Sequence, residues 1–243
     1  MTRRIWVFGS TSPLGTALLR GLEGEAELIC FGRSEPDGDT NRVRVDFSDE
    51  QNLRHALRVN FVERPPSGIV FAQRYRPVME SPTLDSVAAG LKVELGPLFA
   101  LVDLLKEYGN PGLLRSIVMY SSTAAHSTHL DVPVFYHLLK SATLSSVISL
   151  SHDLGGYSVK INALILGDFL KYSIESYSDK EKLNFKKIAE ISADRRCGSL
   201  SDVVAMTRYL LSSEANYITG QAIHVDGGAN LIAPTSYIRT ISL

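Results

Sequence analysis

The sequence predicts an α/β protein in which helices cover both faces of one doubly wound parallel sheet. Short apolar runs, typical of buried parallel strands, alternate along the chain with longer segments of helical character. A glycine-bounded turn separates the first apolar run from the first helical segment. The chain has 243 residues, enough for one large domain with a substantial core, and no repeat, linker or low-complexity segment divides it. We therefore expect a single domain.

The first half of the chain supplies four strands and three helices. Residues 4–8 are a short apolar run, and the helical segment that follows begins at Pro13, a residue suited to the first turn of a helix. Residues 33–42 contain Pro36 and Gly38, which disfavour helix, so we expect no helix between the second and third strands. The strand candidates are 4–8, 26–31, 42–46 and 67–71, and the helix candidates are 13–22, 49–62 and 84–108.

The second half continues the alternation. Residues 116–120 form an apolar run that ends in a pair of serines. Strands separated by helices pair in parallel, and ligands then bind beyond the carboxyl ends of the strands. The strand candidates here are 115–120, 158–164 and 221–225, and the helix candidates are 132–152, 179–190 and 201–213.

Composition and charge argue against several classes of protein. A net charge of −1 gives no general electrostatic basis for binding nucleic acid or an anionic membrane. Cys30 and Cys197 fit neither a disulfide framework nor a paired zinc motif, and His126 and His129 have no third partner at a ligand spacing, so we expect no metal. The first strand begins almost at Met1, and no apolar run approaches the length that spans a membrane. We expect a cytoplasmic protein.

Tyr136 and Lys140 stand four residues apart, a spacing that places both side chains on one face of a helix. A free tyrosine has a pKa of about 10, and a nearby ammonium group favours the phenolate and brings that pKa toward neutrality. The pair therefore suits acid–base catalysis, although chance also supplies such pairs on solvated helix faces.

Three further motifs accompany this pair. The turn from Gly9 to Gly15 leads into a helix start, where free N–H groups and the helix dipole suit a pyrophosphate. Ser121 and Ser122 end the apolar run at 116–120. The last motif covers residues 217–228, which include Thr-Gly-Gln and Val-Asp-Gly-Gly.

In this order the four motifs resemble the short-chain dehydrogenase/reductase family, over residues 5–228, nearly the whole chain. The resemblance implies a Rossmann-like fold and hydride transfer between a nicotinamide cofactor and a carbonyl or secondary alcohol. By resemblance, Ser122 and Tyr136 hydrogen-bond the substrate oxygen, and Tyr136 is the proton donor or base. Lys140 lowers the pKa of the tyrosine and holds the nicotinamide ribose. The cofactor contacts it implies are Gly9, Ser10, Thr11, Ser12, Leu14, Gly15, Arg33, Asp46, Phe47, Ala72, Tyr136, Lys140 and Gly167.

The choice of cofactor depends on the end of the second strand. Residues 30–33 carry no carboxylate that would bind the ribose hydroxyls of NAD and repel a 2′-phosphate. Arg33 stands where NADP-dependent relatives often carry a basic residue, and a guanidinium suits a phosphate, although Arg33 is also compatible with a solvated loop position. Asp46 matches the family aspartate that contacts adenine. NADP(H) is favoured, with NAD(H) as the other possibility.

Several residues depart from the family pattern. Pro13 replaces a glycine of the phosphate turn and has no N–H to donate. Ala72-Gln73-Arg74 replaces Asn-Ala-Gly after the fourth strand, and Glu94 replaces the catalytic asparagine. Pro97 leaves the carbonyl of Val93 without its helical donor, so we expect a helix irregularity that preserves the proton path. Glu94 is also a candidate for a direct role beside Lys140.

The substrate and partners are the least determined features. Arg74 and Arg76 either recognise an anionic substrate, through a carboxylate or phosphate, or they face solvent or form structural pairs. Residues 168–198 are expected to cover the substrate, and the apolar tail 229–243 to pack against another subunit, which by resemblance implies a homodimer or homotetramer.

Two functions remain open from the sequence. The first is an NADP(H)-dependent oxidoreductase that interconverts a small-molecule carbonyl and a secondary alcohol. The second is a degenerate relative that binds a nucleotide or a partner and senses without turnover.

Overall fold

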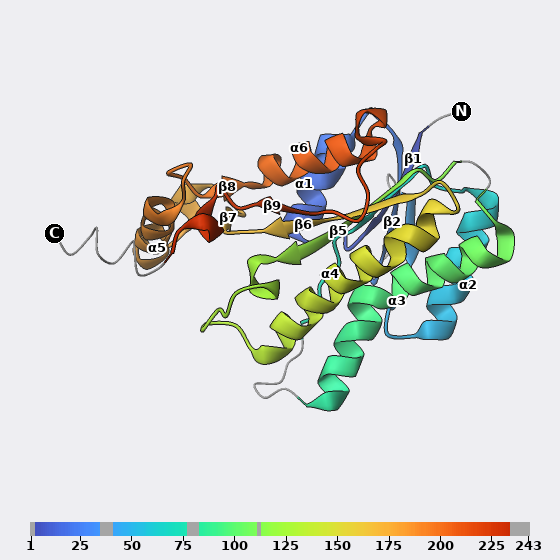
Figure 1. Cartoon of the computed structure of the whole chain (residues 1–243), viewed down its shortest axis with the longest axis horizontal. Coiled ribbons are helices and arrows are strands. Elements are labelled where there is room, and N and C mark those ends of the chain that lie inside the picture. Colours follow the sequence, from blue (N-terminus) through green and yellow to red (C-terminus); the bar gives the residue numbers. More distant parts are fainter. Residues whose placement is uncertain (1–2, 35–40, 77–82, 111–112, 234–243) are drawn as a thin grey trace.

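A computed structural model of the chain describes residues 3–34, 41–76, 83–110 and 113–233. Its centre is a seven-stranded parallel sheet with the order β3-β2-β1-β4-β5-β6-β9 (Figure 1). The strands are β1 (Arg4–Phe8), β2 (Glu27–Gly32), β3 (Asn41–Arg44), β4 (Gly68–Phe71), β5 (Ser116–Ser122), β6 (Lys160–Leu166) and β9 (Ala222–Val225). The chain winds outward from β1 to β3 and then crosses to β4, so the direction of winding switches between β1 and β4. In such sheets a ligand crevice lies at this switch point.

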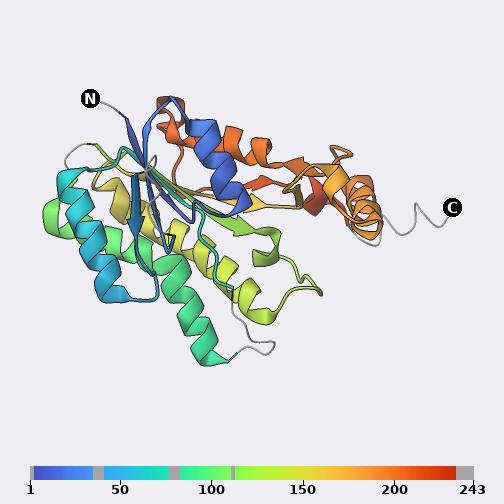
Figure 2. The ribbon, with the colours of Figure 1, turned by 180° about the vertical axis from the view of Figure 1, so that it is seen from behind.

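Helices cover both faces of the sheet, as Figures 1 and 2 show from opposite sides. One layer contains α1 and α6, which pack on the side of the sheet that buries Ile5 and Val7. The other contains α2, α3 and α4, which pack on the side that buries Trp6 and Phe8. Because both faces are covered, the central strand β4 is a continuous apolar run, and every one of its residues is buried. The helices are α1 (Pro13–Leu22), α2 (Glu50–Glu63), α3 (Leu84–Tyr108), α4 (Val134–Gly155) and α6 (Leu200–Leu211).

Polar side chains cap several helices and so fix where they begin. Thr83 and Ser86 form a reciprocal capping box at the start of α3. Ser12 caps α1, with Pro13 as its first residue, and Asp49 caps α2. These caps account for the close agreement between expected and observed helix starts.

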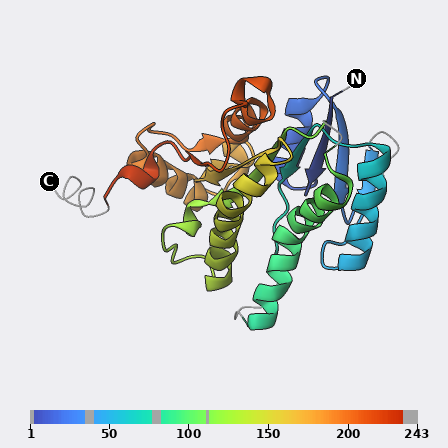
Figure 3. The same ribbon diagram turned by 45° about the vertical axis from the view of Figure 1, so that its right-hand side comes forward.

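Residues 169–199 form a small unit at one end of the molecule (Figures 1 and 3). It contains β7 (Phe169–Leu170), α5 (Asp179–Ile191) and β8 (Gly198–Ser199), and β7 pairs in parallel with β8. Short 3-10 turns complete the described elements: η1 (Thr123–Ala125), η2 (Ile174–Ser176), η3 (Ser213–Ala215) and η4 (Ala229–Leu231).

The predicted α/β class and parallel sheet are confirmed, with shifts at element ends. The strand expected at 158–164 is Lys160–Leu166, and the helix expected at 132–152 is Val134–Gly155. The pairing of β7 with β8 was not predicted, because two-residue strands carry no periodicity. The helix-free link between the second and third strands falls largely on residues 35–40, and most of the C-terminal tail on residues 234–243, both outside the described residues.

Candidate active site

The loop after β1 approaches a neighbouring strand end closely. Gly9 has a φ of +78°, in the left-handed region that favours glycine. A Cβ at Gly9 would lie 2.6 Å from the backbone of Gln73, which follows β4. A Cβ at Gly15 would collide with the carbonyl of Gly9. Both glycines are therefore required by the packing of this turn.

The start of α1 faces the same loop. Ser12 Oγ accepts a hydrogen bond from the N–H of Gly15 at 3.0 Å. Pro13 has no N–H, and the N–H of Gly15 is taken by Ser12. Leu14 therefore supplies the N–H that the first turn of the helix can offer to an anion. The predicted turn therefore exists, with one donor fewer than a glycine at position 13 would give. The other predicted turn residues are Ser10, which is buried, and Thr11, which is exposed.

Arg33 and Asp46 lie at the ends of two adjacent strands. Asp46 Oδ1 accepts hydrogen bonds from the hydroxyl and the backbone N–H of Ser48, at 2.7 and 2.9 Å. These bonds, with a smaller contribution from the Arg33 charge, hold the pKa of Asp46 below its usual range. The Arg33 charge thus acts on the Asp46 carboxylate, so the two residues predicted to contact the adenosine lie near each other. The side chain of Phe47 packs in the core against Phe8, so only its backbone faces this region.

Sequence reasoning missed Arg42. The register of β2 and β3 places Arg42 opposite Cys30. Both residues line a small cavity together with the turn residues Gly9, Ser10 and Thr11, and with Gly32 and Ser34. Arg42 therefore lies on the same side of the sheet edge as the glycine turn. Only the strand register could have revealed it.

Ser121 and Ser122 have different environments at the end of β5. Ser121 is buried, and its hydroxyl donates to the backbone carbonyl of Lys140 at 2.9 Å. Ser122 is only partly buried, and its Oγ accepts the N–H of Ala124 at 3.2 Å. This bond uses a lone pair of Ser122 and leaves its O–H free to donate to a ligand. Of the two serines, Ser122 has the hydroxyl proton available, and its role with the substrate stays a prediction.

Helix α4 is bonded to the segment that follows Ser122. His137 Nδ1 lies 2.8 Å from the carbonyl of Ala124, and the hydroxyl of Ser141 donates to the carbonyl of Ala125 at 3.0 Å. These bonds hold α4, with Tyr136 on it, beside the strand end that carries Ser122.

Tyr136 and Lys140 lie on one face of α4, and Lys140 is held by Glu94. Lys140 Nζ lies 5.6 Å from the centre of the Tyr136 ring. The same ammonium donates to Glu94 Oε2 at 2.7 Å, and both side chains of this pair are at most 6% exposed. The buried pair joins α3 to α4. The expected proximity of Glu94 to Lys140 is therefore present as a direct ion pair.

The segment after β4 is also joined to Glu94. Tyr75 donates its backbone N–H to Glu94 Oε1 at 3.2 Å, and Gln73 Nε2 donates to the backbone carbonyl of Glu94 at 2.9 Å. Between these anchors, the exposed Arg74 places its guanidinium 4.6 Å from the centre of the Tyr136 ring, a cation–π distance. Arg76, the second predicted arginine, is exposed at the edge of the described segment.

Pro97 lies inside α3, which runs without interruption from Leu84 to Tyr108. The carbonyl of Glu94 accepts its hydrogen bond from Gln73, outside the helix. Pro97 also removes one backbone N–H donor from this turn of α3, so the hydrogen bonding of the helix changes locally here. The proton path that we expect there stays a prediction.

The ends of β6 and β9 are packed closely together. A Cβ at Gly167 would lie 2.7 Å from the Cβ of Asp226, so no other residue fits there without rearrangement. Gly227 and Gly228 follow with φ of +61° and +75°. The Asp226 turn has the structural character expected of it.

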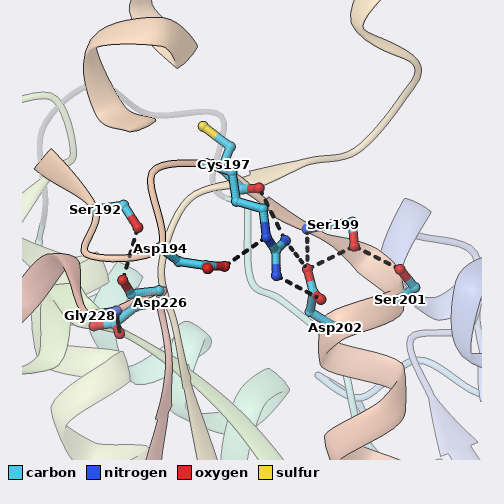
Figure 4. Close-up of polar contacts among 10 residues, drawn as sticks. Ser192, Asp194, Cys197, Ser199, Ser201, Asp202, Asp226 and Gly228 are labelled. Carbon is cyan, nitrogen blue, oxygen red and sulfur yellow. Dashed lines mark hydrogen bonds and ion pairs between the residues drawn. The ribbon is translucent and has the colours of Figure 1, made fainter. Parts of the chain in front are cut away.

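Ion pairs and hydrogen bonds join residues 192–202 to one another and to this turn (Figure 4). Arg196 bonds both Asp194 and Asp202 at 2.7 Å, and Ser192 donates to the carbonyl of Gly227 at 2.9 Å. The Arg196 hydrogen bond holds the pKa of Asp202 well below its usual range. These contacts fix the return of this segment into α6.

No group of three or more His, Cys, Asp and Glu side chains among the described residues could hold a metal ion. Among the helices described, none combines the length and apolar character needed to cross a membrane.

Comparison with known proteins identifies the family. The sequence profile of a family described as enoyl-(acyl carrier protein) reductase matches residues 68–230, about two thirds of the chain. An uncharacterized oxidoreductase of Mycobacterium tuberculosis is 34% identical over 115 residues, which are 46% of this chain and 43% of the relative. Human dehydrogenase/reductase SDR family member 4 is 34% identical over 117 residues, 46% and 40% of the two chains. The matched segments span less than half the length of these curated relatives.

Solved structures extend the likeness in fold to nearly the whole chain. Aldohexose dehydrogenase of Thermoplasma acidophilum superposes with a TM-score of 0.80 at 19% identity, over 96% of both chains. A 4-hydroxyisoleucine dehydrogenase complexed with NADH also gives a TM-score of 0.80, at 20% identity, over 95% of this chain and all of that one. Taken with the profile match, the fold and the ordered motifs, these findings show that the chain belongs to the short-chain dehydrogenase/reductase family of oxidoreductases, which use nicotinamide cofactors.

Proposed function

We propose that the chain interconverts a carbonyl and a secondary alcohol, with NADP(H) as the hydride carrier. One observation carries this proposal. Helix α4 holds Tyr136 and Lys140 on one face, with Lys140 Nζ 5.6 Å from the Tyr136 ring centre, and is hydrogen-bonded to the strand end that carries Ser122. A chain without turnover has no chemical need for these three groups together.

The residues at the carboxyl edge of the sheet fit a nicotinamide nucleotide. The turn from Gly9 to Gly15 and the start of α1 suit its pyrophosphate. Gln73 Oε1 is buried without a hydrogen-bond partner among the described residues, and the backbone of Gln73 lies against Gly9. A buried acceptor of this kind calls for a donor, and ribose hydroxyls or an ordered water supply one.

When bound, the nicotinamide supplies or accepts the hydride. The protein's own residues manage the proton and the substrate oxygen. Tyr136 gives its hydroxyl proton to the carbonyl oxygen in reduction and removes it from the alcohol in oxidation. Ser122 donates its free O–H to the same oxygen and stabilises the charge that develops there.

Glu94 holds Lys140 in this arrangement. Its carboxylate engages part of the Lys140 ammonium, and the remaining N–H groups are available to the nicotinamide ribose. We assign Glu94 a positioning role, which it performs through Lys140.

NADP(H) is the proposed cofactor because the adenosine side carries two guanidinium groups. Arg33 follows β2, and Arg42 lines the cavity beside the glycine turn. A 2′-phosphate bound at this edge would form charge-assisted hydrogen bonds with a guanidinium.

A fluorescence titration of the purified protein with NADPH and with NADH tests the proposal first. We expect NADPH to bind at least about tenfold more tightly, as one charge-assisted contact to the 2′-phosphate would give. Preference for NADH would overturn the cofactor assignment. Screening of carbonyl compounds should then find turnover that depends on Tyr136.

A sensor without turnover is the alternative, and Pro13 is the observation that favours it, since it removes a phosphate donor. If neither NADPH nor NADH binds, the result favours a sensor without turnover over an oxidoreductase.

A further inference from the structure

Arg74 places a positive charge beside Tyr136, and the proposed function assigns no role to this charge. Arg74 is exposed, and its guanidinium lies 4.6 Å from the centre of the Tyr136 ring. The Tyr136 hydroxyl stands on the rim of the same ring. A group held by this guanidinium therefore lies close to an oxygen that bonds the Tyr136 hydroxyl.

The backbone that carries Arg74 is fixed on both sides. On one side, Gln73 packs against Gly9 and bonds the carbonyl of Glu94. On the other, Tyr75 donates its N–H to Glu94 and packs its ring at 6.2 Å from the ring of Phe135, the residue before Tyr136. These anchors make the placement of Arg74 a property of the fold.

Arg74 has no negatively charged partner among the described residues of the site. Lys140 and Glu94 form a buried pair at 2.7 Å and offset each other, and the second oxygen of Glu94 is engaged by the N–H of Tyr75. No carboxylate among the described residues pairs with Arg74. Within the described residues, Arg74 thus adds one positive charge without a counter-charge beside Tyr136.

A guanidinium matches one ligand chemistry better than others. Its planar fork of donors fits a carboxylate or phosphate in a bidentate arrangement. The cofactor pyrophosphate has its own site at the start of α1, whereas Arg74 faces the tyrosine.

We propose that Arg74 binds the carboxylate of the substrate, and that the chain acts on 2-oxo or 3-oxo acids and the corresponding hydroxy acids. This inference rests on the proposed function, because it takes Tyr136 as the proton donor. In the reduction, the oxo carbon gains a hydride as NADPH is oxidised to NADP⁺. The oxo oxygen gains the proton of Tyr136, and the carboxylate is unchanged.

The test compares acids with their neutral esters in a binding assay that needs no turnover. The protein is titrated calorimetrically with 2-oxobutanoate and acetoacetate, and with their methyl esters, in the presence and absence of NADP⁺. Wild type should bind the acids more tightly than the esters. Arg74→Gln should weaken acid binding roughly 10- to 100-fold, as expected for loss of hydrogen bonds to a charged group, and leave the esters unaffected.

Two further variants make the result specific. Arg74→Lys keeps the charge without the planar fork and should recover only part of the acid affinity. Lys106→Gln removes a cation from the exposed end of α3, away from the site, and should behave as wild type.

Three outcomes overturn the inference: equal binding of acids and esters by wild type, unchanged acid binding in Arg74→Gln, or a comparable loss of NADPH affinity in Arg74→Gln, which would assign Arg74 to the cofactor. Failure of the proposed function looks different. In that case NADPH is not oxidised by any carbonyl compound, whether or not acid binding depends on Arg74.

Discussion

The buried pair of Glu94 and Lys140 makes a measurable contribution to stability. Glu94→Gln keeps the shape of the side chain but removes the negative charge, and it leaves one carbonyl oxygen where the carboxylate offers one oxygen to the Tyr75 N–H and the other to Lys140. Lys140 is then left buried without a counter-charge. Breaking a buried pair by removing one partner costs about 3–5 kcal/mol, and we expect the lower end because glutamine can still accept from Lys140.

The cost converts into a shift of the thermal midpoint. For a domain of this size, 1 kcal/mol corresponds to about 2–4 °C, so a loss of about 3 kcal/mol lowers Tm by roughly 6–12 °C. Thermal and denaturant unfolding, followed by circular dichroism at neutral pH and fixed protein concentration without cofactor, measure the shift.

Helix α3 offers a matched control. Glu107, near its end, pairs with Arg58 at 2.8 Å, but the two side chains are 48% and 55% exposed. Glu107→Gln should therefore cost at most about 1 kcal/mol. In a double-mutant cycle, Lys140→Met should recover part of the loss caused by Glu94→Gln. If Glu94→Gln lowers Tm no more than Glu107→Gln does, the buried pair does not stabilise the fold and the reasoning is wrong.

Three other predictions concern the catalytic and ionic groups. Tyr136→Phe should reduce kcat roughly 10²- to 10⁴-fold with a much smaller change in the NADPH Kd; equal activity of this variant would remove Tyr136 from the mechanism. Arg33→Ala and Arg42→Ala should each raise the NADPH Kd about tenfold without changing the NADH Kd, and equal losses for both nucleotides would rule out a 2′-phosphate contact. Because the Arg196 hydrogen bond lowers the pKa of Asp202 in the folded state, this pair stabilises the protein at neutral pH and is lost as the pH falls through that lowered pKa. Asp202→Asn should therefore lower Tm at pH 7, and its difference from wild type should shrink below about pH 4, where the unfolded carboxyl takes up its proton; a constant difference between pH 7 and pH 3 would contradict the assigned cause.

The sheet and the order of its motifs were predictable because they depend on local patterns. The central buried strands are apolar runs that the sequence shows directly. The four-residue spacing of Tyr136 and Lys140 places both side chains on the same face of a helix. The Arg42 position was not predictable, since it depends on the register of β2 against β3. The pair of Glu94 and Lys140 joins residues 46 positions apart through side-chain directions that no periodicity encodes.

The departures from the family pattern after β4 and on α3 form one connected arrangement. Gln73 and Tyr75 both donate to Glu94, at its carbonyl and its carboxylate, and Glu94 in turn accepts from Lys140. Unrelated losses in a degenerating site would leave buried donors and acceptors unmatched, at a cost of about 1–3 kcal/mol each. Here the new residues satisfy one another, except for Gln73 Oε1, which is buried and without a partner among the described residues. That exception lies against the glycine turn where a nucleotide would bind, so the arrangement favours an altered active site over a lost one.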